Sequence, residues 1–218
     1  MKVLVIGDSY GLPRYAKNSF NVELDYAGTY PEQLRSANFT EDVCLVNRCR
    51  HANTSLSLIK GEANEIEFLR PDYTILQLGL VDLWPAEGRK IWPLYSEQYG
   101  RDPWVTPDEY KNNLQLFLNF ANSRGSKVIV INNPPVEKVH LLKHAGLEKK
   151  IVLYNNLLTR LTFGKSVNLL DWYDRIKSLD GKCIFSSDGI HPTREAANLL
   201  ARLLLQQISL FEDGVVNG

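Results

Sequence analysis

A serine near the start of the chain and an aspartate–histidine pair near its end are the residues best suited to chemistry. Ser9 lies in Gly7-Asp8-Ser9-Tyr10, and the pair lies in Asp188-Gly189-Ile190-His191. A serine hydroxyl becomes a useful nucleophile when a nearby base takes its proton. An imidazole suits that task near neutral pH, and a carboxylate can orient it and stabilise its protonated form. Brought together, Ser9, Asp188 and His191 would form a catalytic triad.

Five short apolar runs predict the strands that position these residues. The runs are nearly continuous in apolar character, as expected of strands covered on both faces, and they span 3–6, 43–46, 73–78, 127–131 and 167–170. Helical patterns separate them, with a capping box at Thr106–Glu109, two helices over 137–163 and another after Thr193. The alternation predicts an α/β fold, a three-layer α/β/α sandwich with a five-stranded parallel, flavodoxin-like sheet.

Length and composition predict a single domain over residues 1–218. The chain has 25 basic and 25 acidic residues, and this balance argues against a nucleic-acid or anionic-membrane partner. No apolar run approaches the length of a membrane span. Three cysteines without Cys-x-x-Cys spacing, and a first apolar run too short for a signal peptide, predict a cytoplasmic protein.

The segment 84–104 interrupts the alternation of strands and helices. It contains three of the four tryptophans, two tyrosines and three basic residues. Long loops without secondary structure often form lids or binding walls. One interpretation of the aromatic insertion is therefore a lid or binding wall. The other is an aromatic cap that packs over the sheet edge or into a subunit interface, and the sequence favours neither.

No metal or cofactor is expected. His140 and His144 are four residues apart but lack a third ligand, so they are interpreted as exposed histidines on a helix surface. The glycines do not form a nucleotide-binding pattern. Asp8 and Asp82 are interpreted as residues that hold the backbone of their loops. Two further residues lie near the expected site without a catalytic assignment, His51 and Cys49.

The first and last motifs resemble those of the SGNH/GDSL hydrolase superfamily, which includes esterases, lipases, thioesterases and carbohydrate acetylesterases. Gly7-Asp8-Ser9-Tyr10 matches the motif of the nucleophilic serine, and Asp188-Gly189-Ile190-His191 matches the motif of the catalytic acid and base. The motifs span nearly the whole chain. The resemblance implies the same three-layer sandwich and a serine esterase that works through an acyl-serine intermediate.

The two middle motifs depart from the family pattern. The glycine whose N–H normally enters the oxyanion hole is replaced by Ala52, which still has an N–H. The third motif, normally Gly-x-Asn-Asp, reads Gly79-Leu80-Val81-Asp82, and valine has no side-chain donor. Removing one oxyanion donor typically costs about 100- to 1,000-fold in rate. We therefore expect weak turnover or a replacement donor.

The candidates for that replacement, or for substrate binding beside Gly79, are Asn53, Arg50, Arg48 and Asn133. An arginine there could also bind an anionic or sugar-bearing substrate through paired hydrogen bonds. Alternatively, Arg48 and Arg50 pair with surface carboxylates.

Three functions remain open at this stage. The resemblance implies an esterase or acetylesterase, and similarity to members with Gly-x-Val-Asp implies an acylated carbohydrate or another small ester as substrate. The same site could serve an O-acyltransferase, with a sugar hydroxyl in place of water. A non-catalytic carbohydrate-binding protein is the third, although such a protein has no need for Ser9, Asp188 and His191 together.

Overall fold

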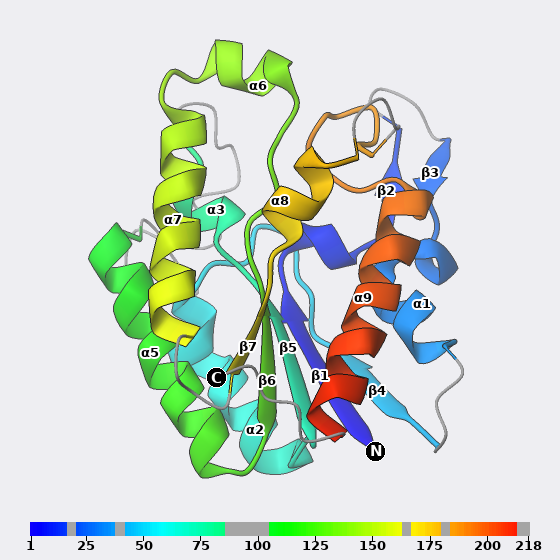
Figure 1. Ribbon diagram of the computed structural model, residues 1–218, viewed down its shortest axis with the longest axis vertical. Coiled ribbons are helices and arrows are strands. Elements are labelled where there is room, and N and C mark those ends of the chain that lie inside the picture. The colour runs from blue at the N-terminus through cyan, green and yellow to red at the C-terminus, as the bar shows by residue number, and fades with distance from the viewer. Residues whose placement is uncertain (17–20, 38–41, 86–104, 163–166, 180–183, 213–218) are drawn as a thin grey trace.

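A parallel five-stranded sheet forms the centre of the molecule. The computed structural model describes residues 1–16, 21–37, 42–85, 105–162, 167–179 and 184–212. The strands lie in the order β4-β1-β5-β6-β7, all parallel (Figure 1). Their bounds are β1 Lys2–Gly7, β4 Cys44–Asn47, β5 Tyr73–Gln77, β6 Lys127–Ile131 and β7 Val167–Leu170. This is the flavodoxin-like order, so the predicted fold class is confirmed.

Helices connect the strands and cover both faces of the sheet. They are α1 Tyr30–Arg35, α2 Ala63–Leu69, α3 Leu80–Leu83, α5 Pro107–Ser123, α6 Lys138–Lys143, α7 Leu147–Thr162, α8 Trp172–Lys177 and α9 Arg194–Glu212. Shorter turns are η1 Ser9–Gly11, η2 Tyr26–Gly28 and the π-helical η3 Leu58–Glu62. The predicted capping box forms at Thr106 and Glu109, and Gly146 separates α6 from α7 with φ +82°.

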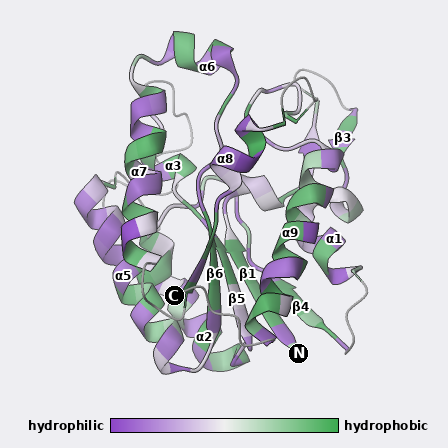
Figure 2. Ribbon diagram, viewed as in Figure 1, coloured by the Kyte–Doolittle hydropathy of each residue, from purple (hydrophilic) through white to green (hydrophobic). Residues whose placement is uncertain are grey.

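The alternation of strand side chains divides the core into two layers. Leu4 and Ile6 of β1 point to one face and pack in the layer that contains the buried sides of α5 and α7. Val3 and Val5 point to the other face, in the layer that contains the buried sides of α1 and α9. The strands are mostly hydrophobic in Figure 2, while the long helices carry both polar and apolar residues. This amphipathic pattern is what predicted the helices.

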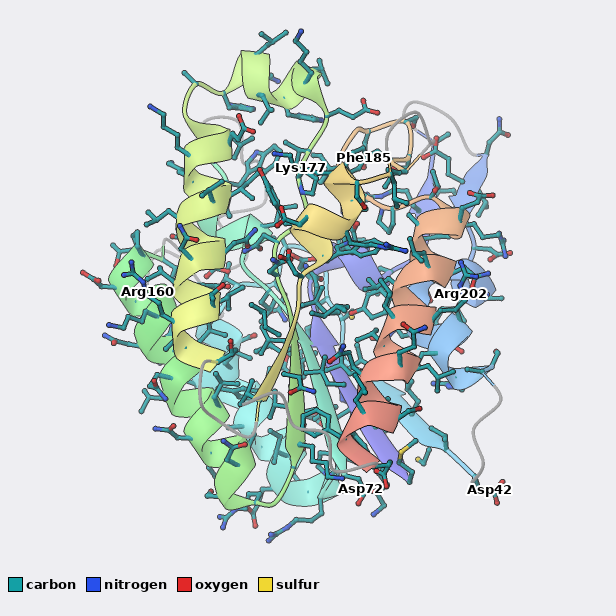
Figure 3. The ribbon with its side chains drawn as sticks, in the orientation of Figure 1. Asp42, Asp72, Arg160, Lys177, Phe185 and Arg202 are labelled. Atoms are coloured by element: carbon teal, nitrogen blue, oxygen red, sulfur yellow. The ribbon has the colours of Figure 1, made fainter. Side chains whose placement is uncertain are left out.

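A small antiparallel hairpin, β2 Arg14–Tyr15 and β3 Val22–Leu24, was not predicted. It lies with α6 and α8 beyond the carboxyl ends of the sheet strands (Figure 1). Phe185, which precedes the aspartate–histidine motif, lies at this end, whereas Asp72 lies at the opposite end (Figure 3). The predicted aromatic insertion 84–104 lies outside the described residues apart from Trp84 and Pro85. None of the helices in the described ranges combines the length and apolar character needed to cross a bilayer.

Candidate active site

Ser9 begins the turn that follows the central strand β1. The carboxylate of Asp8, which is 2% exposed, caps this turn by accepting a hydrogen bond from Tyr10 N at 2.9 Å. The interpretation of Asp8 as a backbone-holding residue is thereby confirmed. Gly7 remains paired in β1, and a Cβ atom there would lie 2.9 Å from Cys49 Sγ. Glycine is favoured here because of this close thiol.

Asp188 and His191 lie in the loop that precedes α9. His191 Nδ1 is 2.7 Å from Asp188 Oδ2, and His191 Nε2 is 2.8 Å from Ser9 Oγ. Asp188 Oδ1 accepts hydrogen bonds from Ser186 Oγ, Ile190 N and His191 N at 2.9–3.0 Å. Gly189 turns the chain between the two residues with φ +70°, a region that favours glycine. The fold thus brings Ser9 and His191, 182 positions apart, into hydrogen-bond contact.

The surroundings keep the carboxylate charged and the imidazole neutral. Burial by itself would raise the pKa of Asp188, but the hydrogen bond and charge of His191 and two backbone N–H groups outweigh it and hold this pKa well below its usual value. Burial lowers the pKa of His191, and electrostatic interactions with Arg14 and His51 lower it further against the opposing effect of Asp188. A neutral imidazole can accept the proton of Ser9.

Tyr10 supports the ring of His191 from behind. The two rings stack with centroids 6.4 Å apart and an angle of 29° between their planes. The buried Tyr10 hydroxyl accepts a hydrogen bond of 2.9 Å from Trp172 Nε1 in α8. The position of the imidazole is therefore tied to the core beneath it as well as to Asp188.

The loop after β4 approaches Ser9 from the other side. Its backbone is attached to the end of β1, because Arg50 N and Asn53 Nδ2 both donate to the carbonyl of Gly7, at 3.1 Å each. Ala52 lies between them in the left-handed region, with φ +50°. Alanine in this conformation is strained by about 1–2 kcal/mol, so the position is one that glycine would fill more easily.

The side chains of the second loop have structural partners. Arg50 pairs with Glu62 at 3.4 Å and Arg48 pairs with Glu65 at 3.1 Å. Asn53 is 1% exposed, and its amide is the one bound to Gly7. These contacts correspond to the alternative in which the arginines pair with carboxylates, although Glu62 is fully buried rather than on the surface. The structure gives none of the three a contact with Ser9.

The loop after β5 shows how the third motif is used. Asp82 accepts hydrogen bonds from Ser55 N at 3.0 Å and Ser55 Oγ at 2.7 Å, which confirms its predicted structural role. Asn133 is buried and paired with Asn155, its Nδ2 donating to Asn155 Oδ1 at 3.1 Å. A Cβ on Gly79 would lie 2.6 Å from Asn133 Oδ1, so Gly79 is packed onto this asparagine pair. The hydrogen bonds of the Asn133 side chain and backbone N–H go to Asn155 and not to Ser9.

Three residues contact the aspartate–histidine loop without having been predicted to do so. Arg14 of β2 lies 3.3 Å from Asp188 Oδ2, and Glu23 of β3 accepts a hydrogen bond from Ser187 N at 3.2 Å. On the other side, His140 Nε2 lies 2.6 Å from the carbonyl oxygen of Asp188. A short hairpin has no strong pattern in sequence, and contacts across 164 positions leave no local signal.

The expectation for the two helix histidines is corrected. His140 and His144 are half-buried, and the ring of Trp84 packs against both with centroid distances of 5.6 and 5.7 Å. Within the described ranges, no group of three or more His, Cys, Asp or Glu side chains is arranged to hold a metal ion.

Comparisons with known proteins identify the fold. A scan against protein-family models and a sequence search of curated proteins both give no match. Among solved structures, the chain is similar to a lipase/acylhydrolase from Enterococcus faecalis, with a TM-score of 0.71, 16% identity and 95% and 94% of the two chains covered. It is also similar to an alpha/beta hydrolase enzyme from the metagenome of Lake Arreo, Spain, with a TM-score of 0.70, 22% identity and coverage of 100% and 96%.

An acetylxylan esterase from Geobacillus stearothermophilus is a third such structure, with a TM-score of 0.69, 19% identity and coverage of 95% and 93%. Variants of that esterase that replace a serine, an aspartate or a histidine by alanine are described as catalytic mutants. At these identities, the comparisons show that the fold is shared.

Proposed function

We propose that this protein is a serine hydrolase of carboxylic esters of the SGNH/GDSL type. The observation that carries the proposal is the continuous chain of contacts from Ser9 Oγ to His191 Nε2 at 2.8 Å and from His191 Nδ1 to Asp188 Oδ2 at 2.7 Å. The acetylxylan esterase supports it, because the residue types of its catalytic mutants are the types found here. A serine, histidine and aspartate in this geometry can activate the serine for attack on a carbonyl carbon.

The reaction follows from the geometry of the three side chains. His191 accepts the Ser9 proton at Nε2 while its Nδ1–H donates to Asp188, and Ser9 Oγ forms a bond to the ester carbon. The backbone N–H groups of Ser9 and Ala52 stabilise the negative oxygen of the intermediate. His191 then protonates the leaving alcohol, and an acyl-Ser9 ester remains. Water, deprotonated by His191, attacks that ester and releases the carboxylic acid and free Ser9.

An acylated carbohydrate or another small ester is the proposed substrate. The support for a sugar is the likeness to an acetylxylan esterase and the expected similarity to members with Gly-x-Val-Asp. The same acyl-Ser9 intermediate could pass its acyl group to a sugar hydroxyl, and the experiment below separates that outcome. We also propose that the chain acts as a single domain, since its described residues share one sheet and its two covering layers.

Acetate release tests the proposal. Purified protein is incubated with p-nitrophenyl acetate and with acetylated xylooligosaccharides, with and without an unacetylated oligosaccharide as acceptor. The variant Ser9→Ala should lose turnover, while the matched control Ser209→Ala, on the exposed side of α9, should retain it. Acetyl transfer to the acceptor in excess of hydrolysis would identify an acyltransferase. Activity that survives Ser9→Ala would contradict both the esterase and the acyltransferase.

A further inference from the structure

The loop that carries Asp188 and His191 is held by the β2–β3 hairpin at two points. On β3, both carboxylate oxygens of Glu23 lie within 3.2–3.3 Å of Ser187 N. On β2, Arg14 Nη2 lies 3.3 Å from Asp188 Oδ2, the same oxygen that faces His191 Nδ1. Arg14 pairs with Leu24, the neighbour of Glu23, across the hairpin, so the two contacts come from two paired strands. The hairpin therefore places a cation directly beside the carboxylate of the triad.

Arg14 contacts Asp188 as an ion pair rather than through a hydrogen bond. Arg14 Nη2 is at ion-pair distance from Asp188, yet Nη2 and Nε are buried without a hydrogen-bond partner among the described residues. The side chain is 22% exposed, so its charge acts through partly water-excluded surroundings, where Coulomb interactions are strong. Three carboxylates interact with it, those of Asp188, Glu23 and Asp8, and they favour its charged form although burial lowers its pKa.

We propose that Arg14 is a positioning residue of this site: its guanidinium fixes the Asp188 carboxylate and disfavours the imidazolium form of His191. The proposal deepens the proposed function, because it assigns control of the general base to a residue outside the triad. Among the described residues, the titratable or charged groups that act on His191 are Asp188 on its own loop, Arg14 on β2 and His51 on the loop after β4, and the pKa of His51 is itself lowered by burial and by Arg14. The neutral ring of Tyr10 faces it from η1.

The sign of the effect follows from the charges. A positive guanidinium repels a positive imidazolium, so Arg14 lowers the pKa of His191, and its removal must raise that pKa. His191 has to be neutral to accept the Ser9 proton. Loss of Arg14 should therefore move the acid limb of the pH–rate profile to higher pH. A residue with a purely structural role would reduce activity or stability without moving this limb.

The test is a titration of His191 by NMR, which does not require turnover. The chain has only four histidines, and the His191 signal can be identified by its loss in His191→Gln. In Arg14→Gln, the pKa of His191 should rise by roughly half a unit to one unit. Arg14→Lys should restore most of the wild-type value, because the charge is kept. The matched control Arg124→Gln, in an ion pair with Glu67 remote from this loop, should leave the value unchanged.

A second variant keeps the test decisive if Arg14→Gln fails to fold. Glu23→Gln keeps an acceptor for Ser187 N but removes a negative charge next to Arg14, so the pKa of His191 should fall. An unchanged or lowered pKa in Arg14→Gln, or an unchanged pKa in Glu23→Gln, would overturn the proposal. If the NMR shifts occur but no ester is hydrolysed, the proposed function fails while the role of Arg14 stands. If hydrolysis occurs, its acid limb should shift with the NMR value.

Discussion

The two sides of Ser9 differ in how completely they match the proposed ester chemistry. On the acid–base side, His191 and Asp188 form a continuous series of short contacts, and residues from three other elements hold them in place. On the oxyanion side, Ala52 has a strained backbone and Val81 offers no donor. Under the proposed function, Ser9 is activated by its neighbours while part of the stabilisation of its intermediate is missing. Activation and oxyanion stabilisation are separate contributions to the rate.

The largest effect is expected on the acid–base side, from Asp188→Asn. The amide would favour the wrong tautomer of His191, and kcat should fall by roughly 10³- to 10⁴-fold at neutral pH. Steady-state kinetics on p-nitrophenyl acetate measures this loss. The matched control Asp174→Asn, on the exposed side of α8, should stay close to wild type. A loss of less than tenfold would show that Asp188 and His191 do not act as a catalytic acid–base pair.

A gain of function is expected on the oxyanion side, from Val81→Asn. This change restores the donor type that the family pattern places there, and one such donor is worth about 100- to 1,000-fold in full alignment. We expect an increase of roughly tenfold or more in kcat, because Val81 lies in the first turn of α3, two residues after Gly79. Val81→Ala, which removes bulk without adding a donor, should give no gain. Equal rates for Val81→Asn and Val81→Ala would mean that a side-chain hydrogen-bond donor at position 81 does not contribute to the rate.

A smaller effect is expected on stability, from Ala52→Gly. Glycine removes left-handed strain of about 1–2 kcal/mol, and its greater freedom in the unfolded chain offsets part of this gain. The free energy of unfolding in urea should rise by up to about 1 kcal/mol, with the N–H kept and activity retained. Ala145→Gly, at an exposed turn position with negative φ, should be neutral or destabilising. Destabilisation by Ala52→Gly would argue against strain on the oxyanion side.

A pH-dependent effect on stability concerns Asp8, which directly precedes Ser9. Burial raises its pKa from 3.8 to about 7, against the hydrogen bonds from Tyr10 N and Gln77. Between these pH values, the folded protein binds a proton that the unfolded chain releases, so this group contributes stability that is lost as pH rises toward 7. Asp8→Asn should therefore show a weaker decline in stability from pH 4.5 to pH 7.5, measured by urea unfolding. An identical decline in wild type and variant would contradict a raised pKa.

The fold could be predicted from the sequence because its signals are local, and Ser9, Asp188 and His191 could be named as candidates because each of their two motifs is short and continuous. Apolar runs located the five strands, and Thr106 with Glu109 marked the start of α5. The oxyanion side was harder, because the direction of a side chain in a loop has no sequence signal. Asn53, Arg50 and Asn133 have the right chemistry and follow the right strands, yet the structure shows their side chains bound to other groups.

The residues that surround the triad could not be predicted from the sequence either. Arg14 belongs to a two-residue strand, too short for any periodicity, and its partner lies at the other end of the chain. The sequence shows the spacing of His140 and His144, which predicts two histidines on a helix surface. It does not show that the carbonyl of Asp188 lies beside His140 in the folded protein. Such long-range contacts depend on how the loops meet above the sheet, which strand and helix patterns do not specify.

Labelling with a fluorophosphonate tests the central claim most directly, because the reagent reacts with a serine only when a neighbouring base activates it. We expect one adduct, mapped by mass spectrometry to the peptide that contains Ser9. It should be absent in Ser9→Ala, strongly slowed in Asp188→Asn and unchanged in Ser209→Ala. No adduct at Ser9 under conditions that label a known esterase, or labelling that persists in Ser9→Ala, would contradict the account.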